Sequence, residues 1–271
     1  MQHIKRWITA LILAPLLLWI LIKGNLIAVA VLVSVVAVFA VREYLRIIFG
    51  NTEEPVSNTI KLISYGVSVL LVAGAFFQSW EILVLVLALN LMALSVFVLS
   101  RFALDQTIFN SIAKQVLGIV YIPLSLCLLI FIKQMENGTS WIIWFLIVIF
   151  ANDTGAFYTG TFFGKRPLAP NISPKKTIEG SLGGIGASII TGFVFSLIFF
   201  HDFSLSFLTI PGSLLLAVSG QIGDLFESAM KRASGIKDSG RILPGHGGML
   251  DRIDGLLPAI PVLYAYLVFV L

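Results

Sequence analysis

The segment ILVLVLALNLMALSVFVLS, residues 82–100, decides the fold class of this chain, because it carries no charged side chain over its whole length. The hydrocarbon core of a bilayer is about 30 Å thick, and a helix that rises about 1.5 Å per residue needs roughly 20 apolar residues to cross it. Residues 82–100 are therefore long enough to cross a membrane as a single α-helix.

The composition extends this conclusion to the whole chain. Of its 271 residues 58% are hydrophobic and only 12% are charged, whereas a soluble domain carries about 25% charged residues. We therefore predict an all-α, polytopic integral membrane protein. The net charge of +4 gives no indication of nucleic acid binding, since membrane proteins keep an excess of basic residues on the cytoplasmic side. The single Cys127 excludes a disulfide framework and a metal site with two cysteines.

Charge-poor stretches of spanning length recur along the chain and predict about nine transmembrane helices. The first resembles a signal peptide but lacks a small-residue cleavage site, so we expect it to be retained. The stretches are residues 7–22, 24–41, 62–80, 82–100, 115–132, 137–157, 180–200, 203–223 and 255–271.

The basic residues predict the orientation of these spans. If the N-terminus is cytoplasmic and the chain alternates across nine spans, only Lys23 and Lys133 of the 18 Lys and Arg residues lie outside. This skew is typical of a protein with a cytoplasmic N-terminus. Residues 42–60 form a linker long enough to fold locally, and we expect an interfacial helix there.

Polar residues gather in two segments of the second half, at about 151–180 and 224–254. We therefore divide the chain into an apolar N-terminal bundle of about five helices, residues 1–135, and a C-terminal catalytic region, residues 136–271. Both polar segments are expected on the cytoplasmic side.

In the second polar segment, Asp224, Ser228 and Lys231 would share one face if the preceding helix continues past Asp224. An acid, a hydroxyl and an ammonium group in a row suit a cation and the phosphate that it neutralises. Six residues of glycine and proline between 235 and 248 then break any regular helix, and Asp251 and Asp254 follow at the expected start of the last helix.

The first polar segment places Asp153 inside an apolar span, where an acid is a candidate functional residue by default. Lys175 and Lys176 come at the expected entrance of the seventh helix, whose N-terminal donors favour a phosphate. Glycines in residues 181–187 would let neighbouring helices approach closely. This oxygen-rich set of side chains favours Mg²⁺ or Mn²⁺ rather than zinc, since the histidines are far apart in the sequence.

At this point the motifs resemble a known family. The run Ser228-x-x-Lys231-Arg232-x4-Lys237-Asp238-Ser239-Gly240, continued by residues 246–254 (HGGMLDRID), resembles the signature of phosphatidate cytidylyltransferases, also called CDP-diacylglycerol synthases. Residues 152–155 (NDTG) and 173–180 (SPKKTIEG) resemble the family's other polar block. The resemblance covers about residues 150–255.

The resemblance implies an all-helical, Mg²⁺-dependent membrane enzyme that joins CTP to phosphatidic acid, giving CDP-diacylglycerol and pyrophosphate. It also implies a homodimer and assigns metal binding to Asp224 and Asp251, with Mn²⁺ as a substitute and a second cation left open. A bacterial inner membrane, with the active site facing the cytoplasm, is the expected location.

We expect the polar signature residues to divide into two groups. The catalytic group is Asp224, Ser228, Lys231, Lys237, Asp238, His246, Asp251 and Asp254. The substrate-binding group is Asn152, Asp153, Lys175, Lys176, Arg232, Arg241 and Arg252. The charged residues have alternative roles: the acids as helix caps or ion-pair partners, the basic residues as membrane anchors. Ser228 has the alternative of a hydroxyl bonded to its own helix backbone. Glu179 fits a capping role at the seventh helix as well as a catalytic one.

Three other functions compete with this interpretation. An ion-coupled transporter would use intramembrane acids and broken helices, but would show two related halves. A CTP-dependent polyprenol kinase, or another enzyme acting on a lipid alcohol, would share the membrane setting and the phosphate chemistry. A non-catalytic membrane scaffold would not need the charged signature.

Overall fold

A computed structural model describes residues 15–50, 57–102, 108–236, 239–240 and 247–270. Among these residues, eight helical segments are long and apolar enough to cross a membrane, so the predicted helical membrane fold is confirmed. Residues 15–23 are helical as well, while most of the first expected span, residues 7–22, lies outside the described residues. The elements are α2 (Leu26–Phe49), α3 (Asn58–Phe76), α4 (Trp80–Arg101), α5 (Ile108–Ile119), η1 (Val120–Leu124), α6 (Ser125–Gln134), α7 (Gly138–Phe163), β1 (Pro167–Ala169), β2 (Ser173–Thr177), α8 (Ile178–Phe199), α9 (Phe203–Ala233), α10 (Leu250–Ile253) and α11 (Leu256–Phe269).

The chain folds as two compact units. The first consists of Met1–Gln134 and Ala233–Arg252, and the second of Met135–Arg232 and Ile253–Leu271. The segment that follows α9 thus packs with the N-terminal helices, although it carries much of the charged signature. The functional division at residue 135 stays a prediction, because packing alone does not locate catalysis.

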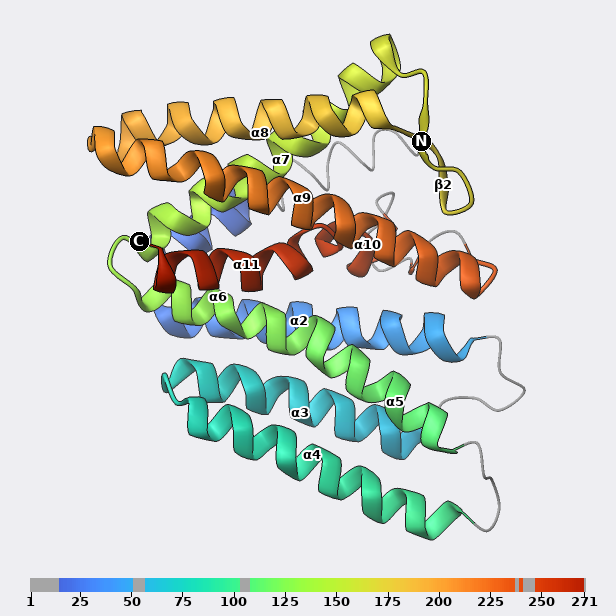
Figure 1. The fold of residues 1–271 in the computed structure, drawn as a ribbon. Helices are drawn as coiled ribbons and strands as arrows, with labels where there is room; N and C mark the ends of the chain where they lie inside the picture. The colour runs from blue at the N-terminus through green and yellow to red at the C-terminus, as the bar shows by residue number, and fades with distance from the viewer. Residues whose placement is uncertain (1–14, 51–56, 103–107, 237–238, 241–246, 271) are drawn as a thin grey trace. The chain divides into compact units, whose positions relative to one another are not determined.

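In the first unit, helices α2 to α6 pack side by side (Figure 1). A buried polar cluster joins three of them. Gln115 on α5 donates hydrogen bonds through Nε2 to Ser64 Oγ on α3 at 3.2 Å and to Asn90 Oδ1 on α4 at 3.1 Å. Between spanning helices such bonds replace the water that the bilayer excludes. The cluster therefore fixes the packing of α3, α4 and α5.

The span expected at residues 115–132 contains a local change of helix type. Pro123 lies inside η1, a π-helical turn between α5 and α6. Proline has no N–H to donate, and its ring excludes a regular helical turn. The helix widens at this point and continues to Gln134. The span is therefore present but is not a uniform α-helix.

The interfacial helix expected within residues 42–60 is not formed by residues 42–49, which continue α2 as far as Phe49. Glu43, Tyr44 and Leu45 are buried in this extension. The span expected at residues 24–41 ends before the first charged residue, whereas packing within the first unit carries the helix two turns further. This difference places a carboxylate inside the unit.

In the second unit, α7 packs along α8 at very short range (Figure 1). Glycines make this approach possible, as predicted. A Cβ at Gly184 would lie 2.7 Å from the backbone oxygen of Asn152, and one at Gly183 would lie 2.1 Å from Thr159 Oγ1. Contacts of this kind let helices associate in lipid, where no hydrophobic force drives them together.

A short antiparallel hairpin, β1 paired with β2, joins α7 to α8 and is a small exception to the all-α prediction. Lys175 and Lys176 therefore lie on a strand that leads directly into α8. Thr177 is the N-cap of α8, since its Oγ1 accepts a hydrogen bond from Gly180 N at 3.1 Å. The extended strand turns the two lysines in opposite directions.

Candidate active site

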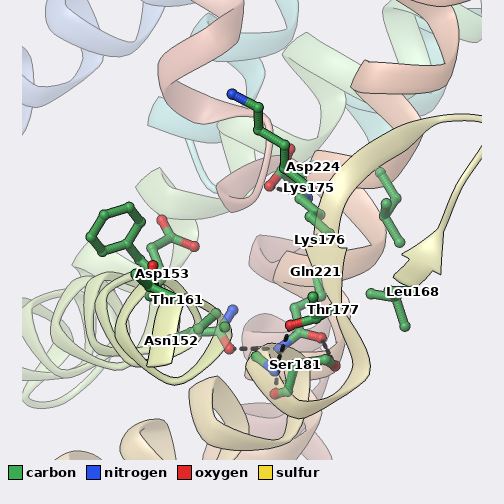
Figure 2. Close-up of a pocket in the computed structure, with 15 residues that line it drawn as sticks. Asn152, Asp153, Thr161, Leu168, Lys175, Lys176, Thr177, Ser181, Gln221 and Asp224 are labelled. Carbon is green, nitrogen blue, oxygen red and sulfur yellow. Dashed lines mark hydrogen bonds and ion pairs between the residues drawn. The ribbon is translucent and has the colours of Figure 1, made fainter. Parts of the chain in front are cut away.

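A cavity of about 490 Å³ opens in the second unit, between side chains of α7, the hairpin, α8 and α9 (Figure 2). Its polar lining comes from the first polar segment, from Asp224 at the start of the second, and from two residues between them. The polar side chains are those of Asn152, Asp153, Thr161, Lys175, Lys176, Thr177, Ser181, Gln221 and Asp224. A cavity with convergent polar groups is the usual form of a small-molecule site.

An ion pair crosses this cavity. Lys176 Nζ on β2 contacts Asp224 Oδ2 on α9, and the dashed line in Figure 2 marks it. The side chains retain 29% and 38% of their exposure, so a ligand in the cavity can reach both. The ammonium group of this pair is suited to contact a phosphate, and the carboxylate is suited to contact a metal ion.

An amide network supports the floor of the cavity. Gln221 Nε2 on α9 donates to Asn152 Oδ1 on α7 at 2.9 Å and to the backbone oxygen of Ser181 on α8 at 3.0 Å, and Gln221 Oε1 accepts from Ser181 Oγ. Gln221 was not among the expected site residues. Its signal in the sequence was a single amide in an apolar span, one helical turn before Asp224.

Three carboxylates of the second unit interact electrostatically, those of Asp153, Asp224 and Asp254. Gly223 permits the close approach of the Asp254 backbone, because a Cβ there would lie 2.3 Å from the backbone oxygen of Asp254. Within the described part of the chain, no three acidic, His or Cys side chains are close enough together to hold a metal ion. The carboxylate, amide and hydroxyl oxygens of the cavity nevertheless are the donor types that Mg²⁺ prefers.

The helix that carries Asp224 continues to Ala233, so the condition under which Asp224, Ser228 and Lys231 share one helical face is met. Lys231 forms an ion pair with Glu227, whose side chain is fully buried. Arg232 donates through Nε to the backbone oxygen of Ile172 in the hairpin turn at 3.3 Å. These two basic residues thus have structural contacts besides any role toward substrate.

Asp251 belongs to the first unit, where its carboxylate accepts hydrogen bonds from backbone N–H groups. Its Oδ1 and Oδ2 accept hydrogen bonds from Ser239 N at 3.2 and 3.1 Å, and Oδ2 also accepts from Gly248 N at 2.9 Å. Gly247, between these contacts, has a φ of +85°, a conformation that favours glycine. Backbone N–H groups of Ser239 and Gly248 thus converge on the Asp251 carboxylate.

The comparisons with known proteins complete this description. The chain matches the cytidylyltransferase family over residues 4–270. The chain belongs to this family. It is 34% identical to the phosphatidate cytidylyltransferase of Staphylococcus aureus (strain COL) over 267 residues, which cover 97% of this chain and 98% of the relative. The phosphatidate cytidylyltransferase of Staphylococcus haemolyticus is 34% identical with the same coverage, and that of Bacillus subtilis is 40% identical over 65% of this chain and 64% of its own.

In this cytidylyltransferase family member, the expected site residues fall into three groups. Lys237, Asp238, Arg241 and His246 lie outside the described residues. Asp251 and the exposed Arg252 are in the first unit. The others are in the second unit: Asn152, Asp153, Lys175, Lys176, Asp224, Ser228, Lys231, Arg232 and Asp254.

Glu179 has a local structural task in this family member. Its Oε2 accepts from the backbone N–H groups of Lys165 and Arg166 at 3.0 and 3.1 Å, and its Oε1 pairs with Arg166 Nε at 3.0 Å. Thr177, and not Glu179, caps α8. Glu179 thus fastens the chain that leaves α7 to the first turn of α8, which sets the start of the hairpin that carries Lys176.

Proposed function

We propose that the protein transfers the CMP group of CTP to phosphatidic acid, giving CDP-diacylglycerol and pyrophosphate. The observation that carries this proposal is the full-length similarity to phosphatidate cytidylyltransferases. The cavity between α7, β2 and α9 supports it, because a charged site beside apolar spans suits a reaction between a nucleotide and a lipid phosphate.

In this reaction a phosphate oxygen of the lipid attacks the α-phosphorus of CTP. The new P–O bond forms as the bond from the α-phosphorus to the bridging oxygen breaks, and that oxygen leaves with the electron pair as part of pyrophosphate. The nucleophile is already anionic, so no strong general base is needed. The barrier lies in bringing two anions together, which requires positive charge and fixed orientation.

Lys176, which is paired with Asp224, supplies positive charge to the cavity. We propose that it contacts the phosphates of CTP and that Lys175 and Arg232, both exposed near the hairpin, attract the lipid phosphate. When substrate binds, the Lys176 ammonium exchanges part of its contact with Asp224 for phosphate oxygens. Ser228 and Lys231, which follow Asp224 on α9, and Asp254 are proposed to assist in binding the phosphates and the cation.

Magnesium is the proposed cofactor, with Mn²⁺ as a substitute. The oxygen donors of the cavity fit it, and Asp224 and Asp153 are the residues of the second unit that would hold it. Bound Mg²⁺ would neutralise charge on the nucleotide phosphates and on the departing pyrophosphate. The assignment of Asp251 as a second ligand stays a prediction.

The chain is an integral membrane protein, since eight of its described helical segments are long and apolar enough to cross a bilayer. We propose a cytoplasmic N-terminus, from the distribution of Lys and Arg, and an active site on the cytoplasmic face. A bacterial inner membrane is the proposed location, and a homodimer the proposed assembly. Light scattering of the detergent-solubilised protein would measure the mass of that assembly.

The test of the proposed function uses purified full-length protein in detergent with labelled CTP, phosphatidic acid and Mg²⁺. We expect CDP-diacylglycerol and pyrophosphate in equal amounts from the wild type. We expect Asp224→Asn and Asp251→Asn to form almost no product. Glu136→Gln, an exposed acid in the turn between α6 and α7, is the matched control and should retain wild-type activity.

The remaining outcomes separate the alternatives. Product from Asp251→Asn at the wild-type rate would reduce that residue to a structural role while keeping the reaction. Phosphorylation of a polyprenol by CTP, without CDP-diacylglycerol, would replace the proposed acceptor. Folded wild-type protein that acts on neither lipid would overturn the proposal, and ion-coupled transport would then be measured in vesicles.

A further inference from the structure

Glu43 is a buried acid of the first unit that the proposed reaction does not use. It lies on α2, is only 3% exposed, and has the buried residues Tyr44 and Leu45 beside it. A carboxylate is costly to bury unless donors satisfy it. The identity of its hydrogen-bond partners therefore shows what the residue does.

Both of its hydrogen-bond partners lie in the part of the family signature that follows α9, which we call the signature segment (residues 234–254). Glu43 Oε2 accepts a hydrogen bond from Ser239 Oγ at 3.0 Å and another from Leu250 N at 2.8 Å. These donors are 196 and 207 residues away in the sequence. One carboxylate oxygen on α2 therefore links Ser239 to Leu250, two residues of this segment that are eleven positions apart.

Two glycines of the signature make room for this carboxylate. A Cβ at Gly240 would lie 2.1 Å from Glu43 Oε1, and one at Gly248 would lie 2.4 Å from Glu43 Oε2. Any side chain at either position would displace the carboxylate. None of the residues that the structure describes donates a hydrogen bond to Oε1, so the contact to the segment runs through Oε2.

Ser239 connects Glu43 to Asp251. Its hydroxyl donates to Glu43, while its backbone N–H donates to both oxygens of Asp251. Gly248 N, the other donor to Asp251, lies two residues before Leu250, whose N–H donates to Glu43. The backbone that orients the Asp251 carboxylate is thus the backbone that Glu43 holds.

We propose that Glu43 is a positioning residue for the cytidylyl transfer, because it fixes through Ser239 and Leu250 the amides that orient Asp251. The inference rests on the proposed function, to which the role of Asp251 belongs. Without Glu43, the Ser239 hydroxyl and the Leu250 N–H lose their acceptor in a buried place, and the segment has to rearrange.

The expected consequence is a loss of rate with little loss of nucleotide binding. A group displaced by about 1 Å can lower the rate by up to about 100-fold. We expect Glu43→Ala to lower kcat by about 10- to 100-fold while KM for CTP changes by less than about threefold. Glu43→Gln keeps an oxygen that can accept from both donors, so it should restore kcat to within about threefold of the wild type.

The experiment combines kinetics with hydrogen exchange on the full chain in detergent. Glu43→Ala should speed exchange in peptides that contain Ser239 and Leu250, and Glu43→Gln should not. Ser68→Ala is the matched control, because Ser68 is also buried and its hydroxyl donates a hydrogen bond to Ser64 O of its own helix. It should change neither kcat nor exchange in the signature segment.

Each outcome supports or overturns the inference. Wild-type kcat and exchange in folded Glu43→Ala would overturn it, and so would a Glu43→Gln variant as slow as Glu43→Ala, since charge rather than hydrogen-bond acceptance would then be required. If Glu43→Ala does not fold, Ser239→Ala provides the test. We expect this variant to have about 3- to 10-fold lower kcat and faster hydrogen exchange around Leu250. A wild-type kcat and wild-type exchange in Ser239→Ala would overturn the inference. A wild type without product but with faster exchange in Glu43→Ala would instead overturn the proposed function and keep the structural link.

Discussion

Lys176 on β2 is paired with Asp224 on α9, although 48 residues separate them in the sequence. Within one cavity of the second unit, the pair joins the first polar segment to the residue at which the second begins. It keeps an ammonium group and a carboxylate partly exposed, each available to a ligand of opposite charge. A substrate that carries several phosphates, together with a divalent cation, is complementary to this arrangement.

Replacing Lys176 with Met removes this positive charge while keeping much of the side-chain volume. A hydrogen bond to a charged group contributes about 1.5–3 kcal/mol, so we expect kcat/KM for CTP to fall by roughly 10- to 100-fold. Lys165→Met is the control, since the backbone N–H of Lys165 bonds to Glu179 and its side chain is exposed. Steady-state kinetics measure both. Equal losses in the two variants would show that the effect is one of general surface charge.

Replacing Gln221 with Leu deletes the donor to Asn152 and leaves that buried amide oxygen without a partner. We expect the free energy of unfolding to fall by about 1–3 kcal/mol, which thermal unfolding in detergent would detect. Ser219→Ala on the same helix is the control, because the Ser219 hydroxyl is exposed and bonds to Leu215 O of its own helix. An unchanged unfolding temperature for Gln221→Leu would mean that the network is not a stabilising element.

Replacing Gly184 with Ala tests the close packing of α7 against α8. The added Cβ would lie 2.7 Å from the backbone oxygen of Asn152 and 3.0 Å from Ala156 Cβ. The helices must separate, so we expect a destabilisation of about 1–3 kcal/mol and reduced activity through displacement of Asn152. Gly186→Ala is the matched control, since a Cβ there meets nothing within 4 Å. It should be neutral or slightly stabilising, because alanine favours a helix.

Removal of divalent cations should abolish the reaction without unfolding the protein. We expect activity to disappear in excess chelator, to return with added Mg²⁺ and to return in part with Mn²⁺. Circular dichroism of the chelated sample serves as the control for folding. Full activity in the chelator would contradict the proposed metal dependence, whereas loss of helical signal would show that the cation is structural.

The orientation of the chain is testable by cysteine labelling, because Cys127 is its only cysteine and is buried. In a Cys127→Ala background, a membrane-impermeant maleimide applied to intact cells should label Glu136→Cys and not Arg166→Cys. Labelling of both should follow when the cells are opened. The reverse pattern in intact cells would place the N-terminus and the cavity outside.

Much of the fold could be predicted from the sequence because bilayer crossing imposes a length and an apolar composition on each span. The described spans match the expected stretches, and the glycines of residues 181–187 correctly predict close packing of α8. The predicted end of the α2 span was two turns too early, because the burial of Glu43 depends on a segment about 200 residues later in the chain. Hydrophobic periodicity also did not predict the π-helical turn at Pro123 or the strand that carries Lys176.

The charged motifs by themselves determined which residue types gather near the membrane, and they identified the family before any contact was known. Only the tertiary structure decided the partners: that Lys176 pairs with Asp224, that Gln221 binds Asn152, and that Glu43 accepts hydrogen bonds from Ser239 and Leu250. Sequence patterns report local periodicity and composition. Ion pairs and buried hydrogen bonds between distant segments depend on how helices pack, and that is settled by side-chain volumes and donor positions in three dimensions.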